Sequence, residues 1–398
     1  MLSQQTMDIV KSTAPVLEVK GREITTCFYN RMFEQHPELL NIFNHANQSK
    51  GRQQTALANM VYAAARHIDR LEEIIPAVRQ VAHKHRSLNV QPEHYPIVGK
   101  YLLLAIKEVL GEAATDDILK AWEDAYGVIA QAFIGIEKDM YSEAREQKAG
   151  WEGFRRFVVD RREKESEVIT SFYIKPEDGG EVPEFLPGQY ITVRVSIPGE
   201  KYAMNRQYSL SAAPGRRYFR ISVKKEADSN PLGKVSNYLH EELQKGSILE
   251  VTPPAGEFIL NMEEQGPVAF ISGGVGVTPM MSMLETISES QPSRDVTFIH
   301  SARSKEVHAF KERARELVGG LENGRIHIGY NEPGDAIEMS FTGHLNEELL
   351  KQWIKPDAVC YVCGPVPFLQ TVTAALKRIG LGNDQIRYEF FGPAMELK

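Results

Sequence analysis

The periodicity of the apolar residues changes twice along this chain of 398 residues. Up to about residue 145 it is helical, and the alternation typical of strands is missing. Short strand-like runs between turn clusters follow to about residue 265, and beyond that point strands alternate with helices. We therefore expect a multidomain chain with an all-α domain over 1–145, an antiparallel β-barrel over 150–265, and an α/β domain with a parallel sheet over 266–398.

Individual strands are predicted from runs of β-branched and aromatic residues between turn signals. In the β region they are expected at 168–174, 190–197 and 218–223, and the second of them has Ile191, Val193, Val195 and Ile197 on one face. In the α/β region they are expected at 268–272, 296–301, 326–330, 358–363 and 386–391.

Composition and charge exclude several classes of protein. Hydrophobic residues make up 42% and charged residues 25%, which is typical of globular proteins and not of disordered chains or coiled coils. The net charge of −7 argues against nucleic acid or an anionic membrane as a partner. No apolar run reaches the roughly 18 residues of a membrane span, and the N-terminus lacks signal-peptide features. Three cysteines suit a reducing compartment, so we expect a cytoplasmic protein, and a monomer because no feature demands a partner.

Two polar residues share a face with apolar stripes in the helical region. Gln53 points the same way as Leu57, so it lies either at the rim of the core or against a ligand. His85 continues a stripe on the helix that begins near Pro76. It is either a histidine favoured by the dipole at the end of that helix or a metal ligand. A lone histidine cannot hold zinc, but it can hold haem iron because the porphyrin supplies further ligands.

Tyr95 and Glu137 lie at the edges of two other apolar stripes. A half-buried carboxylate needs a partner, and a structural ion pair is the simplest one. Spacing alone leaves that alternative open.

The first 145 residues resemble a globin of the flavohaemoglobin family. The resemblance implies that His85 is the proximal ligand of a haem b iron and that Phe43, after the turn at Pro37, packs on the porphyrin. It also implies that a distal pocket is lined by Tyr29, Gln53 and Leu57. On the proximal side, Tyr95 and Glu137 would form a hydrogen-bonding group. A carboxylate bonded to a ligating imidazole increases electron donation to iron, and a distal tyrosine hydroxyl stabilises bound dioxygen.

Residues from about 150 onward resemble the ferredoxin–NADP reductase superfamily. Its R-x-Y-[ST] motif matches Arg206, Gln207, Tyr208 and Ser209. The resemblance implies that Arg206 pairs with the FAD phosphates, that Tyr208 lies against the isoalloxazine, and that Ser209 bonds near the reactive nitrogen with Tyr190 close by. Two further sets of flavin contacts are implied: the pyrophosphate-binding amides of Gly233, Val235 and Ser236 before a helix at 237–243, and the cap formed by Phe391, Gly392 and Pro393.

A glycine-rich run follows the first strand of the α/β region and opens a helix, which is typical of a phosphate-binding loop for NAD(P)H. It consists of Gly273, Gly274, Val275, Gly276, Val277 and Thr278. Cys363 resembles the superfamily's cysteine beside the nicotinamide. A redox pair with Cys360 is disfavoured because residues three apart in a strand point to opposite faces. Arg303 and Lys305 stand where a 2′-phosphate would lie, so use of both NADH and NADPH is expected, although a surface charge cluster explains them equally well.

The resemblance implies a nitric oxide dioxygenase. Oxygen bound to ferrous haem converts NO to nitrate, and NAD(P)H re-reduces the iron through FAD, so the small molecules NO, O2 and NAD(P)H are the expected partners. Two alternatives stay open: an oxygen or NO sensor or store with its own reductase, and a general flavin reductase of ferric chelates or peroxides. Lys84 lies opposite the buried stripe of its helix, and we hypothesise that it faces the flavin domain and helps it to dock.

Overall fold

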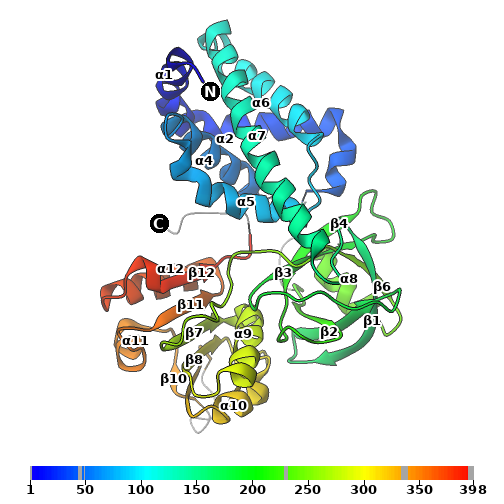
Figure 1. The fold of residues 1–398 in the computed structure, drawn as a ribbon, viewed down its shortest axis with the longest axis vertical. Helices are drawn as coiled ribbons and strands as arrows, with labels where there is room; N and C mark the ends of the chain where they lie inside the picture. The colour runs from blue at the N-terminus through cyan, green and yellow to red at the C-terminus, as the bar shows by residue number, and fades with distance from the viewer. Residues whose placement is uncertain (1, 44–46, 49, 228–231, 333–338, 393–398) are drawn as a thin grey trace.

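The computed structural model describes residues 2–43, 47–48, 50–227, 232–332 and 339–392. A helical part, an antiparallel sheet and a parallel sheet follow one another along the chain, so the predicted fold class and its order are confirmed. In Figure 1 the helical part lies above the two parts that contain the sheets. Among the described residues, no helix combines the length and the apolar character that a membrane span requires.

The N-terminal part is built from helices that pack around a shared apolar core. Helix α5 shows how local sequence sets the ends of a helix. Pro76 stands in its first turn, where a missing N–H costs nothing, and Lys84, His85 and Arg86 stand in its last turn, where positive charge is favoured. The α-helices are α1 (Gln4–Ser12), α2 (Ala14–Gln35), α4 (Arg52–Arg66), α5 (Ile75–Ser87), α6 (His94–Leu110) and α7 (Asp116–Glu146).

The antiparallel sheet has the strand order β4-β3-β6-β1-β2-β5. A bridge from Leu210, just after β4, to Ile221 of β5 brings the two edges together, as in a barrel. The three predicted strands are present, and their apolar faces, with Val193 and Ile221 among them, are buried together. The strands are β1 (Arg155–Lys164), β2 (Ile169–Pro176), β3 (Tyr190–Val195), β4 (Met204–Ser209), β5 (Phe219–Lys224) and β6 (Ile248–Val251), and the helix α8 (Lys234–Glu242) precedes β6.

Helix α8 begins earlier than the pattern indicated. We expected a helix at 237–243, but the structure places Lys234 at its first position and Gly233 at its N-cap. Val235 and Ser236 therefore belong to the first turn and do not precede it. The difference arises because Val235 is a core residue at 1% exposure and anchors this turn to the barrel.

The C-terminal sheet is parallel throughout, with the order β10-β9-β8-β7-β11-β12. The chain order reverses between β7 and β11, and ligands of such sheets bind at the carboxyl ends of the strands at this point. The elements are β7 (Val268–Gly273), α9 (Val277–Ser290), β8 (Asp295–Ala302), α10 (Lys311–Gly319), β9 (Asn323–Tyr330), β10 (Phe341–Thr342), α11 (Glu347–Trp353), β11 (Val359–Cys363), α12 (Val366–Arg378) and β12 (Ile386–Glu389).

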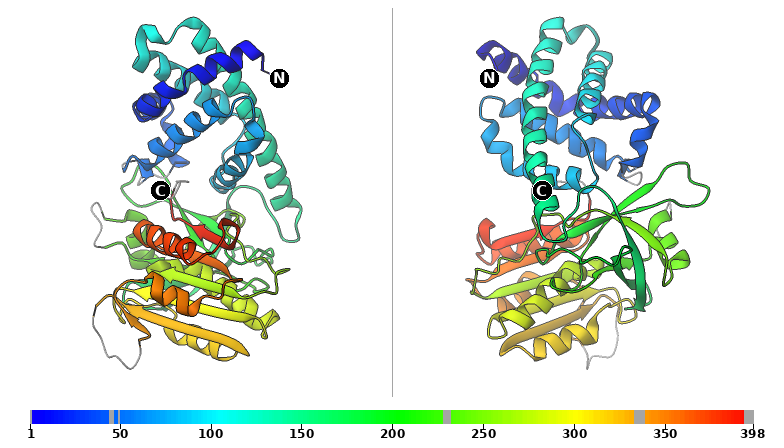
Figure 2. Two further views of the ribbon diagram at one scale, coloured as in Figure 1. Left: turned by 90° about the vertical axis from the view of Figure 1, so that its left-hand side faces the viewer. Right: turned by 45° about the vertical axis from the view of Figure 1, so that its right-hand side comes forward.

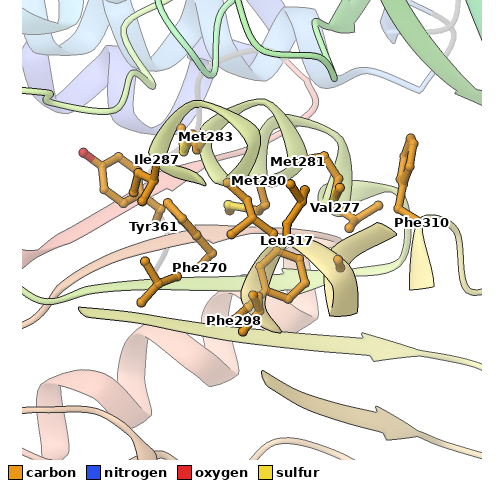
Figure 3. Packing of buried hydrophobic residues seen from close by; sticks show 14 of the residues in the cluster. Phe270, Val277, Met280, Met281, Met283, Ile287, Phe298, Phe310, Leu317 and Tyr361 are labelled. Carbon is orange, nitrogen blue, oxygen red and sulfur yellow. The ribbon is translucent and has the colours of Figure 1, made fainter. Parts of the chain in front are cut away.

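Helices cover both faces of the parallel sheet (Figure 2). On one face, helix α9 packs Met280, Met281 and Met283 against the sheet (Figure 3). The sheet residues in this cluster include Phe270, Phe298 and Tyr361. Helices α11 and α12 cover the other face. Cys363 belongs to the first cluster and Cys360 to the second, so the two thiols lie on opposite faces, as expected from their spacing.

A buried ion pair joins the antiparallel sheet to the parallel-sheet part. Nη2 of Arg220 in β5 lies 2.9 Å from Oε1 of Glu285 in α9, and the two side chains are only 8% and 5% exposed. The other oxygen of Glu285 accepts a hydrogen bond of 2.9 Å from the backbone N–H of Ala213. Both partners are thus satisfied across this interface.

Candidate active site

Helices α5, α6 and α7 bring three polar side chains of the helical part together. His85 Nδ1 lies 2.8 Å from Oε1 of Glu137, and the Tyr95 hydroxyl donates to the same oxygen over 2.6 Å. The Tyr95 hydroxyl oxygen is also 3.2 Å from His85 Nδ1. Glu137 is only 3% exposed, so the structure places the carboxylate, imidazole and phenol in one largely buried group.

The hydrogen bonds of this group leave one imidazole nitrogen available. If Nδ1 carries the proton that Glu137 accepts, the lone pair of His85 is on Nε2. Among the described residues none bonds to Nε2, and 32% of the His85 side chain is open. Burial, with the adjoining Glu137 carboxylate, raises the pKa of Tyr95 well above its usual range, so Tyr95 remains a donor.

This arrangement fits a haem iron better than a protein-only metal site. No group of three or more potential ligands is found among the described residues, and a lone imidazole suffices only where a porphyrin supplies the other donors. His85, through Nε2, is therefore the residue that could hold a haem iron here.

Tyr29, the first residue expected on the distal side, contacts Gln53 of the same set and also Phe43, which is expected to pack on the porphyrin. This side chain of α2 is 5% exposed, and its ring meets Phe43 edge-on with centroids 5.8 Å apart. Burial raises the pKa of Tyr29, and a hydrogen bond with Gln53 opposes that shift. Phe43, Gln53 and Leu57 are half-buried, as expected of residues that line a pocket. Tyr29 thus stays protonated and has a donor proton to offer.

The expected flavin residues lie on β3 and β4. The register pairs Tyr190 with Ser209 and Ile191 with Tyr208, so Tyr190 and Ser209 lie side by side. The one described side-chain hydrogen bond of Arg206 goes to the backbone carbonyl of Asn205 over 2.7 Å, no described carboxylate pairs with it, and burial lowers the pKa of its guanidinium. A sheltered cation without an anion fits a phosphate group.

Gln207 and the first turn of α8 make hydrogen bonds of their own to neighbouring parts of the protein. Gln207 Nε2 donates to Ser87 Oγ of α5 over 2.8 Å, so its side chain faces the helical part. At the start of α8, Ser236 Oγ donates to the Gly233 carbonyl. A Cβ at Gly233 would lie only 2.6 Å from Ser236 Oγ. Val235 is buried in the barrel core, so its backbone amide, and not its side chain, is what could serve a phosphate.

The glycine-rich run forms a tight turn, η4 (Gly274–Gly276), between β7 and α9. Gly274 has φ +54, and a Cβ at Gly276 would lie 2.2 Å from the carbonyl oxygen of Cys363. Only glycine permits this close approach of two strand ends. Val277 and Thr278 begin α9, whose N-terminus faces the same end of the sheet.

A pocket of about 480 Å³ opens beside this turn. Gly273, Gly274 and Val275 line it, Arg303 lies at its rim, and Lys224 and Lys225 of the antiparallel-sheet part contribute to it. Arg303 also lies 3.6 Å from Glu332 in an exposed ion pair, and Lys305 is not among the lining residues. The position of the pocket, between two domains at the switch point of the sheet, suits a dinucleotide.

The described side-chain hydrogen bond of Lys84 goes to the segment after β12 and not to the antiparallel-sheet domain that we expected it to face. Its ammonium donates to the carbonyl of Gly392, in the segment that follows β12. Glu389 is close by, where burial raises its pKa and the Lys84 charge opposes that rise. Phe391 is 42% exposed, and Pro393 lies outside the described residues.

Two residues at the contact between the helical part and the rest were not predicted. Glu389 near Lys84 and Arg86 beside His85 are surrounded by groups that are remote in sequence. Neither stands in a recognisable motif, so no signal in the sequence could have found them.

Comparison with known proteins agrees with this division. Family models match residues 26–133 (globin), 156–259 (oxidoreductase FAD-binding domain) and 270–374 (oxidoreductase NAD-binding domain). A flavohemoprotein of Bacillus thuringiensis subsp. konkukian is 55% identical over 404 residues and 100% of both chains. A flavohemoprotein of Bacillus subtilis is 50% identical over 401 residues, which cover 100% of this chain and 99% of that protein.

Solved structures give the same result. The flavohemoglobin of Malassezia yamatoensis with bound FAD and heme matches with a TM-score of 0.87 at 27% identity. The match covers 98% of this chain and 100% of the flavohemoglobin chain. The FAD/NAD-binding domain of a Vibrio cholerae nitric oxide dioxygenase, 37% identical with a TM-score of 0.56, covers 60% of this chain and 99% of that one. Over its whole length this chain therefore belongs to the flavohemoprotein family, and it is an oxidoreductase whose cofactors are haem, FAD and NAD(P)H.

Proposed function

We propose that the protein is a nitric oxide dioxygenase that turns NO into nitrate at the expense of O2 and NAD(P)H. The observation that carries the proposal is the group of His85, Tyr95 and Glu137. A ligating imidazole that donates to a buried carboxylate gains anionic character and favours oxygen activation over storage. A carboxylate as the partner of the imidazole thus favours oxygen activation over the alternative of simple gas binding.

We assign the proximal iron ligand to His85 and the positioning of its ring to Glu137. The Oε1 atom of Glu137 accepts from the imidazole and from Tyr95, so the carboxylate is held by two donors at 2.8 and 2.6 Å. Tyr126 of α7 donates to the backbone carbonyl of Tyr95 over 2.6 Å and so ties the helix that carries this phenol to the helix that carries Glu137. The imidazole is therefore fixed in both tautomer and orientation.

On the distal side we assign Tyr29 as a hydrogen-bond donor to the gas ligand, with Gln53 and Leu57 lining the same pocket, and we assign Phe43 to packing on the porphyrin. A charge-assisted hydrogen bond of this kind is worth roughly 1.5–3 kcal/mol. The hydroxyl remains protonated because Tyr29 is buried.

When bound, haem supplies one-electron chemistry and dioxygen binding, and FAD converts the two-electron hydride of NAD(P)H into single electrons. We propose that Arg206, Tyr208, Ser209 and Tyr190 hold the flavin, joined by Gln207, by the turn at Gly233, Val235 and Ser236, and by Phe391, Gly392 and Pro393. For the nucleotide we propose the turn Gly273, Gly274, Val275, Gly276, Val277 and Thr278, with Cys363 beside the nicotinamide.

We further propose domain limits of 1–145, 150–265 and 266–398, a monomeric state, and a place in the cytoplasm. A cytoplasmic place is supported by the three cysteines, which are all free thiols: Cys27, Cys360 and Cys363.

An absorption spectrum followed by one kinetic comparison tests the function. The purified protein should show haem and flavin bands, turn ferrous on addition of NADH, and consume NO rapidly under air. The variant His85→Ala should lose haem and NO consumption but keep NADH-driven reduction of dyes. Loss of both activities, or NO consumption that survives in His85→Ala, would contradict the proposal, and dye reduction without NO consumption in the native protein would favour a general flavin reductase.

A further inference from the structure

The proximal helix α5 and a loop of the FAD-binding domain are joined through a buried arginine. Arg86, next to His85, is 4% exposed. Its Nη1 donates to the carbonyl of Pro253 over 3.1 Å, and its Nη2 donates to the carbonyl of Pro254. Figure 1 shows α5 at the lower edge of the helical part, where it faces the sheets.

From this contact we infer that Arg86 is a positioning residue for electron transfer. It fastens α5, and with it His85, to the backbone that carries Tyr190, so that the globin presents a fixed face to the flavin. The inference rests on the proposed function only in that electrons pass from flavin to haem.

The acceptors on the loop are suited to a guanidinium and to little else. Pro253 and Pro254 have no amide hydrogen, so the two residues offer carbonyl oxygens alone. Two consecutive carbonyls match the planar fork of an arginine, whereas an ammonium group lacks that geometry. Arg86 forms no ion pair with a described carboxylate and interacts with Glu143 only through the longer-range field, so these backbone oxygens are the partners that hold it.

The same loop is rigidly tied to Tyr190. The backbone of Ala255 donates to the Tyr190 carbonyl over 2.8 Å, and the Tyr190 amide donates back to Ala255 over 2.9 Å. Gly256 has φ +111, and a Cβ there would lie 2.9 Å from the Tyr190 ring. Residues 253–256 are therefore held against Tyr190 from the flavin side, and they offer Arg86 acceptors whose position does not depend on α5.

Neutral contacts flank Arg86 on α5 but do not replace it. The Gly256 amide donates to His83 Nδ1 over 3.3 Å, and Gln207 donates to Ser87 Oγ over 2.8 Å. Hydrogen bonds from a charged donor are about twice as strong as such neutral ones. Of these three contacts, the one made by the Arg86 guanidinium should therefore matter most for holding α5 against residues 253–256.

The test is anaerobic stopped flow on the holoprotein with excess NADH, with the flavin and haem bands followed separately. The variants Arg86→Met and Arg86→Lys should leave flavin reduction unchanged and slow haem reduction at least about tenfold, the effect of losing one charge-assisted hydrogen bond. Arg66→Lys, an exposed arginine in α4, is the control and should change neither phase. Hydrogen exchange supplies a readout other than activity: the amide of Gly256, which donates to His83 of α5, should exchange faster in both Arg86 variants.

Three results would overturn the inference. Haem reduction could be unchanged in Arg86→Met. It could be fully restored by Arg86→Lys, which would mean that charge and not the fork matters. Flavin and haem reduction could fall together, which would mean that Arg86 merely supports folding. None of these measurements uses NO, so a native protein that fails to consume NO would refute the proposed function and leave this test intact.

Discussion

Replacing Glu285 by glutamine should destabilise the FAD- and NAD-binding domains, because it leaves the buried charge of Arg220 without a carboxylate. The native pair has an N···O distance of 2.9 Å and side-chain exposures of 8% and 5%. Removing one partner of such a pair costs about 3–5 kcal/mol, since the remaining charge stays out of water. The expected change is thus much larger than for an ordinary ion pair.

Thermal unfolding followed by the release of fluorescent FAD measures this effect. For a unit of this size each kcal/mol lowers Tm by about 2–4 °C, so Glu285→Gln should lower it by about 6–20 °C. The matched control is Glu347→Gln, which breaks a pair with Arg378 in the same domain at 2.7 Å but with exposures of 58% and 46%. That pair is worth at most about 1 kcal/mol.

A double variant separates the charge from the packing. Arg220→Met combined with Glu285→Gln removes both charges, keeps a carbonyl oxygen for the Ala213 amide, and should recover most of the lost stability, because no buried charge is left without a partner. Equal shifts of Tm for Glu285→Gln and Glu347→Gln would refute the reasoning. So would a double variant that is less stable than Glu285→Gln alone.

Three further perturbations have defined outcomes. Tyr29→Phe should release oxygen about ten- to a hundredfold faster in stopped flow, and an unchanged rate would remove Tyr29 from its proposed role. Burial lowers the pKa of His300 from 6.5 to about 3, so this imidazole is neutral when folded and takes up a proton on unfolding, which lowers stability as the pH falls below 6.5. Its contribution at about pH 5 is a loss of about 2 kcal/mol, and the fall in Tm between about pH 7.5 and 5 should be smaller in His300→Asn; an identical fall would contradict the assignment. Gly276→Ala should raise KM for NADH about tenfold, because its Cβ would meet the Cys363 carbonyl at 2.2 Å, whereas Gly266→Ala, with open space at that position, should leave KM unchanged.

The sequence predicted elements well wherever one face is apolar and poorly where it is not. Strand β3 was predicted because Ile191, Val193 and Val195 alternate with other residues and are all buried. Strand β1 was not predicted. Its second half is charged and exposed, and a bulge between Val159 and Arg161 breaks the alternation.

The site shows a second limit, which is set by distance along the chain. Periodicity placed Glu137 beside an apolar stripe, but it could not show that the carboxylate meets His85, which is 52 residues away. Only the family resemblance supplied that contact. Arg86 lies next to His85 and was still missed, because its acceptors are backbone carbonyls 167 and 168 residues further along, which no pattern of side chains can reveal.

Several acceptors at the contact between the globin and the rest of the chain are main-chain oxygens, beside side-chain acceptors such as Ser87 and His83. Asn205 donates to the carbonyls of Asn41 and Ile42, Arg86 to those of two prolines, and Lys84 to that of Gly392. Peptide oxygens are present whichever side chain a residue carries, so substitutions in the segments that supply them leave these hydrogen bonds intact. The few donor side chains are then the residues that must be kept. Chimaeras that combine globin and reductase modules from diverged relatives should accordingly assemble whenever those donors are retained.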